Sequence, residues 1–438
     1  MTSSLSRREL LKWFSAGAGA ATIGGGVYFY DRSNPSSVPS TANGPRTVQP
    51  SAVGSTSTSS APALLRANAD PTQRLLVVVE MAGGNDGMSM IVPYGMSGYY
   101  DLRKNTAIAE ADVLAIDNEV GYHPSLPLLH RRGAAVVQGV GSFEGDGSHF
   151  EMRERWWQGS PNRVGTFKTG FLGRLADSIG DPQAPATALS VSYGAHPSMI
   201  SAKAATLTVP NADAASYLVG AGDEDDMLRR FQLAYETFAS TSNLPDAYAD
   251  RLNVMGRARS FASSVGTFDD ESEFGYRDDQ LGSGLRMAAH LFSQNIGLRI
   301  VHITIDGDYD THEDHNGRYP QLMDSLDVSL DAFMNDVSAR GMADRVLVMT
   351  TSEFGRTGRD NDSGGLDHGL ASNMLMLGPV NAGRFGQHPV LSLDTDQSDP
   401  QATSSFDQYY ATVAEDWFGV PSSEVLDGNV TKIDGIIA

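Results

Sequence analysis

The sequence predicts an α/β fold with a largely parallel central sheet, helices on both faces and a helical insertion. Two continuous apolar runs, at 75–80 (L-L-V-V-V-E) and 346–349 (V-L-V-M), are typical of strands that are covered on both sides. Before the second run, apolar residues recur at helical spacing from 322 to 337, and Gly341 follows them. Strand, helix and strand joined by short connections form βαβ units, which imply parallel strands.

The remaining elements follow in chain order. An apolar strand is predicted at 134–140, and the loop G-S-F-E-G-D-G-S-H-F leads from it into a helix that reads E-M-R-E-R-W-W-Q. Residues 220–283 are acidic and poor in strand signal, so we expect a helical insertion there. A helix at 285–295, a strand at 299–305, a fifth strand at 374–377 and a C-terminal helix at 406–418, stopped by Gly419, complete the pattern.

The N-terminal segment, residues 1–32, is predicted to be an export signal. Residues 6–12 read S-R-R-E-L-L-K and precede a weakly apolar stretch from Trp13 to Tyr30. Paired arginines before such a stretch are typical of a twin-arginine export signal. Residues 33–72 are rich in Ser, Thr and Pro and are predicted to form a disordered linker. The folded domain is therefore expected to span 73–438.

Composition excludes several classes of partner and site. The net charge of −21 argues against nucleic acid or an anionic membrane surface as a partner, because both need basic protein surface. Contact with a membrane is expected only through the signal segment, if that segment stays uncleaved. The chain has no cysteine, which excludes disulfides, thiolate metal ligands and a cysteine nucleophile.

Polar residues stand at the ends of successive predicted strands. They are Asp86 after the first strand, Ser148 and His149 after the second, Asp310 and His312 after the third, Glu353 after the fourth, and Asp367 and His368 just before the fifth. Singly, an acid after a strand is most often a helix cap or turn former. Because ligands bind beyond the carboxyl ends of parallel strands, five such coincidences predict one shared site.

Carboxylates and imidazoles without thiolates predict a divalent metal, which could be zinc, manganese, magnesium or calcium. Ser148 stands at a predicted helix start, where the helix dipole and a nearby cation would favour its alkoxide as a nucleophile. An equally good reading makes Ser148 an N-cap, with Glu151 at capping-box spacing. Arg356 is a candidate for binding a substrate oxyanion, although a salt bridge is the commoner fate of an arginine.

A set of motifs carries a family resemblance. G-G-N-D-G, S-H-F followed by W-x-x-G, Y-D-T-H, T-S-E-F-G-R and D-H-G, in this order behind a twin-arginine signal, resemble the bacterial family called domain of unknown function 1501. That family resembles the alkaline-phosphatase-like superfamily of phosphatases, sulfatases and phosphoglycerate mutases, so the resemblance implies an alkaline-phosphatase-like fold for 73–438.

The resemblance also implies ligand positions. The superfamily's first-strand Asp matches Asp86, its final His matches His368, and its D-x-x-x-H pair is matched by Asp310 with His312, or by Asp308 with His312. Where the superfamily has T-S-D-H-G, this chain has T-S-E-F-G, which puts Glu353 on a metal-binding Asp and Phe354 on a metal-binding His. The second of the superfamily's two metal positions is therefore expected to be depleted.

Two functions follow from this reading. The first is an exported metal-dependent hydrolase of phosphate or sulfate esters, acting on a small-molecule ester or oxyanion in the periplasm, at the cell surface or outside the cell. The absence of cysteine excludes the cysteine-derived formylglycine of sulfatases and favours phosphoesters. The second is a non-catalytic exported relative that keeps the fold and serves as a binding or assembly protein.

Export gives the first testable prediction. Replacing Arg7 and Arg8 together with lysine is expected to strand the protein in the cytoplasm, because the twin-arginine machinery reads the arginine pair. Cell fractionation with immunoblotting checks this. Unchanged export of the double variant would show that residues 1–32 are not a twin-arginine signal.

Overall fold

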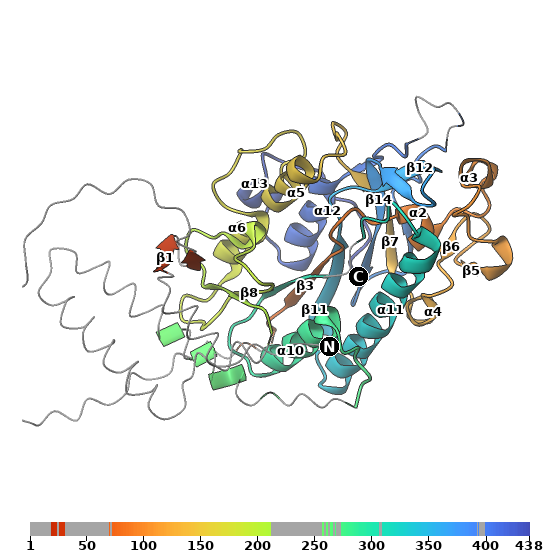
Figure 1. The fold of residues 1–438 in the computed structure, drawn as a ribbon. Coiled ribbons are helices and arrows are strands. Elements are labelled where there is room, and N and C mark those ends of the chain that lie inside the picture. Colours follow the sequence, from red (N-terminus) through yellow and green to blue (C-terminus); the bar gives the residue numbers. More distant parts are fainter. Residues whose placement is uncertain are drawn as a thin grey trace, which may run out of the picture.

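The central sheet organises the molecule. The computed structural model describes strands 19–23 and 26–30, residues 70, 72–211, 256–257, 260–261, 263–265, 268, 273–305, 309–391, 393 and 399–438. Within these residues the chain is a mixed α/β fold, as predicted (Figure 1). The strands, in spatial order, are β1 (Gly19–Ile23), β2 (Gly26–Tyr30), β9 (Thr206–Val209), β8 (Ala188–Val191), β10 (Ile300–Thr304), β3 (Leu75–Glu80), β11 (Val346–Thr351), β14 (Ala371–Leu377), β7 (Ala135–Gly141) and β15 (Gly383–Phe385), and β16 (Ser404–Ser405) also pairs with β7.

The sheet is parallel from β9 through β8, β10 and β3 to β11. β14 then runs antiparallel to both of its neighbours, β11 and β7. The start of β14 therefore lies at the same edge as the ends of the parallel strands. This direction matters for the site, because it moves residues that precede β14 to the carboxyl edge of the sheet.

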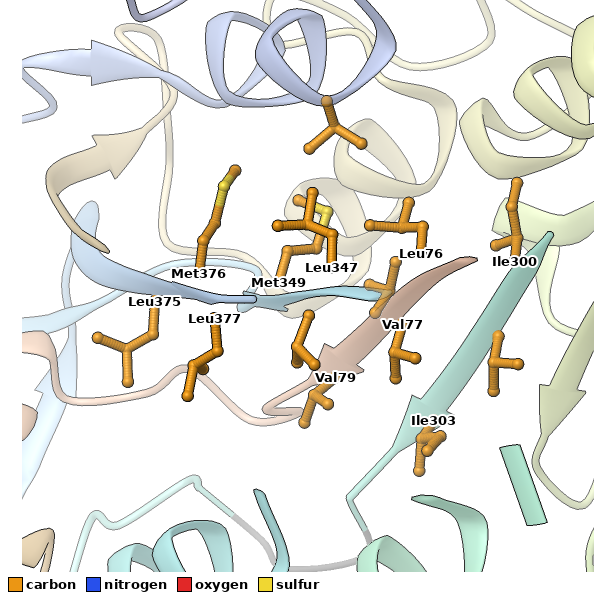
Figure 2. Close-up of a cluster of buried hydrophobic side chains, with 14 of the residues drawn as sticks. Leu76, Val77, Val79, Ile300, Ile303, Leu347, Met349, Leu375, Met376 and Leu377 are labelled. Atoms are coloured by element: carbon orange, nitrogen blue, oxygen red, sulfur yellow. The ribbon is translucent and has the colours of Figure 1, made fainter. Parts of the chain in front are cut away.

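Side chains alternate between the two faces of the sheet, and in the central strands β3, β11 and β14 most of them are buried apolar groups. Leu76, Leu347 and Met376 point to one face, whereas Val77 and Leu377 point to the other (Figure 2). Burial on both faces explains why these strands read as continuous apolar runs rather than as alternating patterns.

Helices cover both faces of the sheet (Figure 1). One layer holds α5 (His149–Gln158), α6 (Phe171–Ile179), α12 (Phe406–Thr412) and α13 (Ser422–Val425). The other holds α10 (Gln280–Ser293) and α11 (His315–Ala339), against which α4 (Pro127–Arg132) packs. The predicted C-terminal helix continues from α12 as a π-helical turn, Val413–Trp417, and ends at Gly419, whose φ is +70°.

Smaller elements lie at the carboxyl edge. β12 (Arg356–Asp360) and β13 (Leu366–His368) form an antiparallel pair between β11 and β14. β4 (Ile91–Val92), β6 (Gly121–Tyr122) and β5 (Leu114–Ala115) form a separate three-stranded sheet beside α2 (Gly87–Met90) and α3 (Ser97–Leu102). These segments frame the loops that follow β3 and β11.

Some predicted segments lie wholly or mostly outside the described residues. These are the linker at 33–72 and the helical insertion at 220–283, whose last four residues open α10. Within the predicted signal segment, β1 and β2 form a hairpin that reaches β9 through Gly26 and Thr206. Among the described helices, none combines the length and apolar character needed to cross a bilayer. Export stays a prediction.

A buried ion pair fixes the loop after β3. Asp86 caps α2 by accepting from the backbone N–H of Met88, and both of its carboxylate oxygens accept from Arg103, at 2.6 and 2.9 Å. The exposed fractions of the Asp86 and Arg103 side chains are 1% and 0%. Burial by itself would raise the pKa of Asp86, but the guanidinium outweighs it and holds this pKa well below its ordinary value.

This pair gives a stability prediction. Replacing Arg103 with methionine is expected to cost about 3–5 kcal/mol of unfolding free energy, because Asp86 is left charged and buried without its partner. The matched control is Arg163→Met, whose ion pair with Asp427 is exposed, so its cost should be within about 0.5 kcal/mol. Urea denaturation measures both. Similar losses of unfolding free energy in the two variants would show that the buried pair Asp86–Arg103 stabilises the fold no more than an exposed ion pair does.

Candidate metal centre

Side chains from three strand-end loops and β13 meet at one place on the carboxyl edge. His149 opens α5 after β7, Asp310 and His312 follow β10, and Glu353 follows β11. His368 ends β13, three residues before β14 begins. These residues lie within contact distance of one another, and the antiparallel direction of β14 is what brings His368 to this edge.

The two histidines His312 and His368 face each other through their Nε2 atoms, which lie 2.8 Å apart. Oδ1 of Asp310 lies 3.1 Å from Nε2 of His312 and 3.3 Å from Nε2 of His368. Three potential ligand atoms thus converge on one small volume. His149 adds a fourth, because its Nε2 lies 3.6 Å from Oδ2 of Asp310.

The tautomers of these histidines follow from their outer contacts. Nδ1 of His368 lies 2.9 Å from the carbonyl oxygen of Gly147, which can only accept, so Nδ1 carries the proton. Nδ1 of His312 lies 3.0 Å from Oδ1 of Asp367. The Asn361 side chain and His312 hold the pKa of Asp367 below its ordinary value, so this carboxylate also accepts. With both Nδ1 atoms committed to acceptors, the two facing Nε2 atoms are available as metal ligands, and their 2.8 Å separation is also that of an N–H···N hydrogen bond between the rings.

Such an arrangement fits a metal ion. Histidine ligands in metal sites commonly donate their other N–H to a carboxylate or a backbone carbonyl, which orients the ring and fixes the tautomer. Asp367 and Gly147 occupy these supporting positions here. Asp367, predicted as a ligand, thus contacts His312 on the side of the ring away from His368.

Arg356 holds Asp310 in place. Its Nη2 donates to Oδ1 of Asp310 at 2.6 Å, and the guanidinium also donates to carbonyl oxygens of the surrounding loops. These oxygens belong to Gly83, Gly84, Tyr309 and Leu366. Burial by itself would raise the pKa of Asp310, but Arg356 outweighs it and the pKa lies below its ordinary value. The Arg356 side chain is 0% exposed, so binding of a substrate oxyanion stays a prediction that these contacts do not support.

Glu353 lies against His149 rather than between His312 and His368. Its Oε1 accepts from the backbone N–H of Gly83 at 2.9 Å and lies 3.0 Å from Nδ1 of His149. This contact orients the imidazole of His149 so that Nε2 faces Asp310. The sequence placed His149 among catalytic candidates, and the structure adds that it lies close enough to Asp310 and His368 for the three to ligate one ion.

Phe354 forms an apolar wall beside the ligands. Its ring centroid lies 4.7 Å from that of His368 and 4.8 Å from that of His149. Its side chain is buried, and a Cβ added at Gly84 would lie 2.3 Å from its Cε2. Tight packing around this ring leaves no donor at the position where the resemblance implies a metal-binding histidine.

The other predicted residues lie at the margin of the centre. Ser148 caps α5, with its hydroxyl 3.5 Å from the backbone nitrogen of Glu151, and its own N–H donates to Asp146. The structure therefore shows Ser148 as the N-cap of α5, and its role as a nucleophile stays a prediction. Asp86 is bound to Arg103 as described above, and Asp308 lies outside the described residues.

Comparisons with solved structures find relatives of low similarity. The structure of Ps i-CgsB matches with a TM-score of 0.41 at 12% identity, covering 82% of this chain and 75% of that one. The lipoteichoic acid synthase LtaP from Listeria monocytogenes matches with a TM-score of 0.38 at 8% identity, covering 84% and 78%. A protein in the alkaline phosphatase superfamily from Vibrio parahaemolyticus matches with a TM-score of 0.36 at 8% identity, covering 85% and 74%. Because these TM-scores and identities are so low, the matches do not support an inference about the chemistry of this protein.

Sequence comparison is more specific. No curated protein matches the chain. A family profile described as "Protein of unknown function (DUF1501)" matches residues 132–404, a span that includes β7, the loop of Ser148 and His149, and all of the converging ligands. Since this match covers more than half of the sequence and every residue of the candidate centre, the chain belongs to the DUF1501 family.

Proposed function

We propose that this protein is an exported metal-dependent hydrolase of phosphate or sulfate esters. The observation that carries the proposal is the convergence of His312, His368 and Asp310. Two imidazole Nε2 atoms 2.8 Å apart, each with its Nδ1 tied to an acceptor, lie beside a carboxylate oxygen. That arrangement offers two imidazoles and a carboxylate to a divalent ion, which would hold its ligand atoms about 3.3 Å apart and would need only a small separation of the two rings.

The donor set narrows the choice of ion. Two imidazoles and a carboxylate suit zinc or manganese better than magnesium or calcium, which prefer oxygen ligands alone. An ion bound there would polarise an ester oxygen and lower the pKa of a coordinated hydroxyl group. Because Phe354 fills the adjacent position, the proposal is for one ion at this centre.

The chain's own residues supply the remaining functions. Ser148 is the proposed nucleophile, because its hydroxyl lies at the N-terminus of α5, directly before His149. His149 is held by Glu353 with Nε2 toward Asp310, the orientation needed to exchange a proton with a group bound at the centre. Arg356 keeps Asp310 fixed and charged.

A second function, a non-catalytic exported binding or assembly protein, is favoured by one observation. Phe354 fills the position where the resemblance implies a metal-binding histidine, and Arg356 is engaged with backbone oxygens, so neither position supplies a group for phosphoryl chemistry. The two functions differ in turnover, because a binding protein would keep the ion without hydrolysing esters.

Metal content gives a direct prediction. His368→Ala is expected to lose the ion of this centre, because removing an imidazole from a small ligand set leaves too few donors. The matched control is His130→Ala, whose ring contacts the carbonyl oxygen of Ala115 away from the centre. Elemental analysis after dialysis against zinc measures both. Equal zinc content in the wild type and His368→Ala would refute the centre.

Ser148 gives a prediction about catalysis. Ser148→Ala and Ser148→Asn are both expected to reduce hydrolysis of aryl phosphates or sulfates by at least about a hundredfold, because the nucleophilic oxygen is gone. Asparagine caps helices as well as serine does, so only the alanine variant should lose about 1 kcal/mol of stability. Steady-state kinetics and thermal unfolding separate the effects. Full activity in Ser148→Asn would identify Ser148 as a cap alone.

A further inference from the structure

A second group of titratable side chains is buried on the sheet face that packs against α5, α6 and α12. Glu80 ends β3, and His302 stands in the middle of β10, within I-V-H-I-T. The register pairs Thr304 with Glu80 and His302 with Val78. Because every second residue of a strand points to the same face, Glu80 and His302 share a face of the sheet. The apolar Leu76 and Ile300 lie on that face as well. The exposed fractions of Glu80 and His302 are only 5% and 2%. Such positions normally hold aliphatic residues.

His196, just before the short helix Pro197–Met199, completes the group. Its Nε2 lies 3.0 Å from Oε2 of Glu80, and Nε2 of His302 lies 3.4 Å from the same oxygen. The two imidazole rings lie against each other, with centroids 3.9 Å apart and planes inclined by 31°. Three potential ligand atoms from distant parts of the chain thus gather around one carboxylate oxygen.

The hydrogen-bond partners in this group are unevenly distributed, because one oxygen of Glu80 has more polar neighbours than lone pairs and one nitrogen of His302 has none within the residues that the structure describes. Oε2 of Glu80 faces the Thr304 hydroxyl at 3.1 Å as well as both imidazoles, which is one polar neighbour more than its two lone pairs. Oε1 accepts only from Nε1 of Trp157 among the contacts in the described part of the chain. Nδ1 of His302 is buried and has no partner among the described residues. Because His302 faces Glu80 through Nε2, an ion bound there would leave Nδ1 as it is, so the argument for an ion rests on the crowding around Oε2 of Glu80.

A small cavity borders the group. Glu80, His302 and Ser198 line it, and it offers about 10 Å³ to the centre of a water-sized sphere, the room that one water or one ion needs. Glu353 also lines this cavity, and its buried Oε2 has no partner among the described residues. Arg153, another lining residue, places its guanidinium over the ring of Trp157.

We infer that Glu80, His196 and His302 form a second, buried site for a divalent cation of the zinc class. A tetrahedral ion with bonds of about 2.0 Å holds its ligand atoms about 3.3 Å apart, which matches the 3.0 and 3.4 Å observed. The supporting contacts match as well. Nδ1 of His196 lies 2.7 Å from the hydroxyl of Ser198, and Trp157 holds the other oxygen of Glu80.

The ligand chemistry is consistent with this assignment. Two imidazoles and a carboxylate are among the ligands that zinc takes in proteins. Because the three residues come from β3, β10 and the segment after β8, an ion there would clamp together parts of the chain that are far apart in sequence. The site is structural in character, and it does not depend on the proposed hydrolase activity.

Anomalous diffraction from crystals of the full chain grown with zinc chloride tests the inference on the wild type. Data collected on either side of the zinc absorption edge should show two peaks. One is expected between Glu80, His196 and His302, and the other between Asp310, His312 and His368. Absence of the first peak overturns the inference whatever happens at the second, and absence of the second alone counts only against the proposed hydrolase.

Variants provide an independent readout in solution. His302→Val is expected to lower bound zinc from two ions per chain to one and to lower the melting temperature, because the clamp loses a ligand. If the group were held by hydrogen bonds alone, replacing a half-paired buried imidazole with valine would leave zinc content unchanged and stability equal or higher. That result would overturn the inference.

A matched control is available in His123→Val. His123 is 4% exposed and its Nδ1 accepts from the backbone N–H of Ser125, outside both groups of ligands. Its zinc content should stay at two ions per chain. His368→Ala should also lose one ion, and the double variant with His302→Val should lose both, since the two sites share no ligand. Loss of the same single ion in His302→Val and His368→Ala would show that there is only one site.

Discussion

The buried guanidinium of Arg356 is the constraint on which the carboxyl edge depends. A charge with no exposed surface must have its N–H groups paired, and here the partners are backbone carbonyl oxygens and Asp310. The oxygens come from the loop after β3, the loop after β10 and the start of β13. One side chain thus ties three loops together and fixes Asp310, whose carboxylate is central to the candidate centre.

Glycines make this arrangement sterically feasible. Gly83 and Gly84 have φ values of +110° and +91°, a region that other residues rarely adopt. A Cβ at Gly83 would lie 2.6 Å from the nitrogen of Asp310, and one at Gly84 would strike the ring of Phe354. The G-G-N-D-G motif is therefore needed for close packing and for turning its carbonyl oxygens toward Arg356. Its aspartate, Asp86, serves the neighbouring ion pair with Arg103.

Phe354 and Glu353 give the centre its asymmetry. On one side, His312, His368 and Asp310 converge with the Nε2 atoms of the two rings facing each other, and on the other the aromatic ring of Phe354 excludes further donors. Glu353 contacts His149 through Oε1 and also lines the neighbouring cavity. It therefore stands between the partly exposed candidate centre and the buried Glu80 group.

The sequence by itself determined the strands at 75–80 and 346–349, the long helix before Gly341 and the position of Asp310, His312 and Glu353 at the ends of parallel strands. These follow from local periodicity and from the rule that parallel strands end at one edge, and neither needs a knowledge of distant contacts. The antiparallel direction of β14, which puts His368 at that edge, is set by its pairing with β11 and β7 and has no local signal.

Only the tertiary structure decided which polar side chain pairs with which. Asp86 and Arg356 have the spacing and chemistry of site residues, yet their partners are Arg103 and the carbonyl oxygens of loops far away in sequence. The Glu80 group was missed for the same reason. Its signal was an acid ending one apolar strand and a histidine inside another, and only the register of β3 with β10 and the position of His196 unite them. Pairing of buried charges is a long-range property, because desolvation forces each charge to find whatever partner the fold brings near.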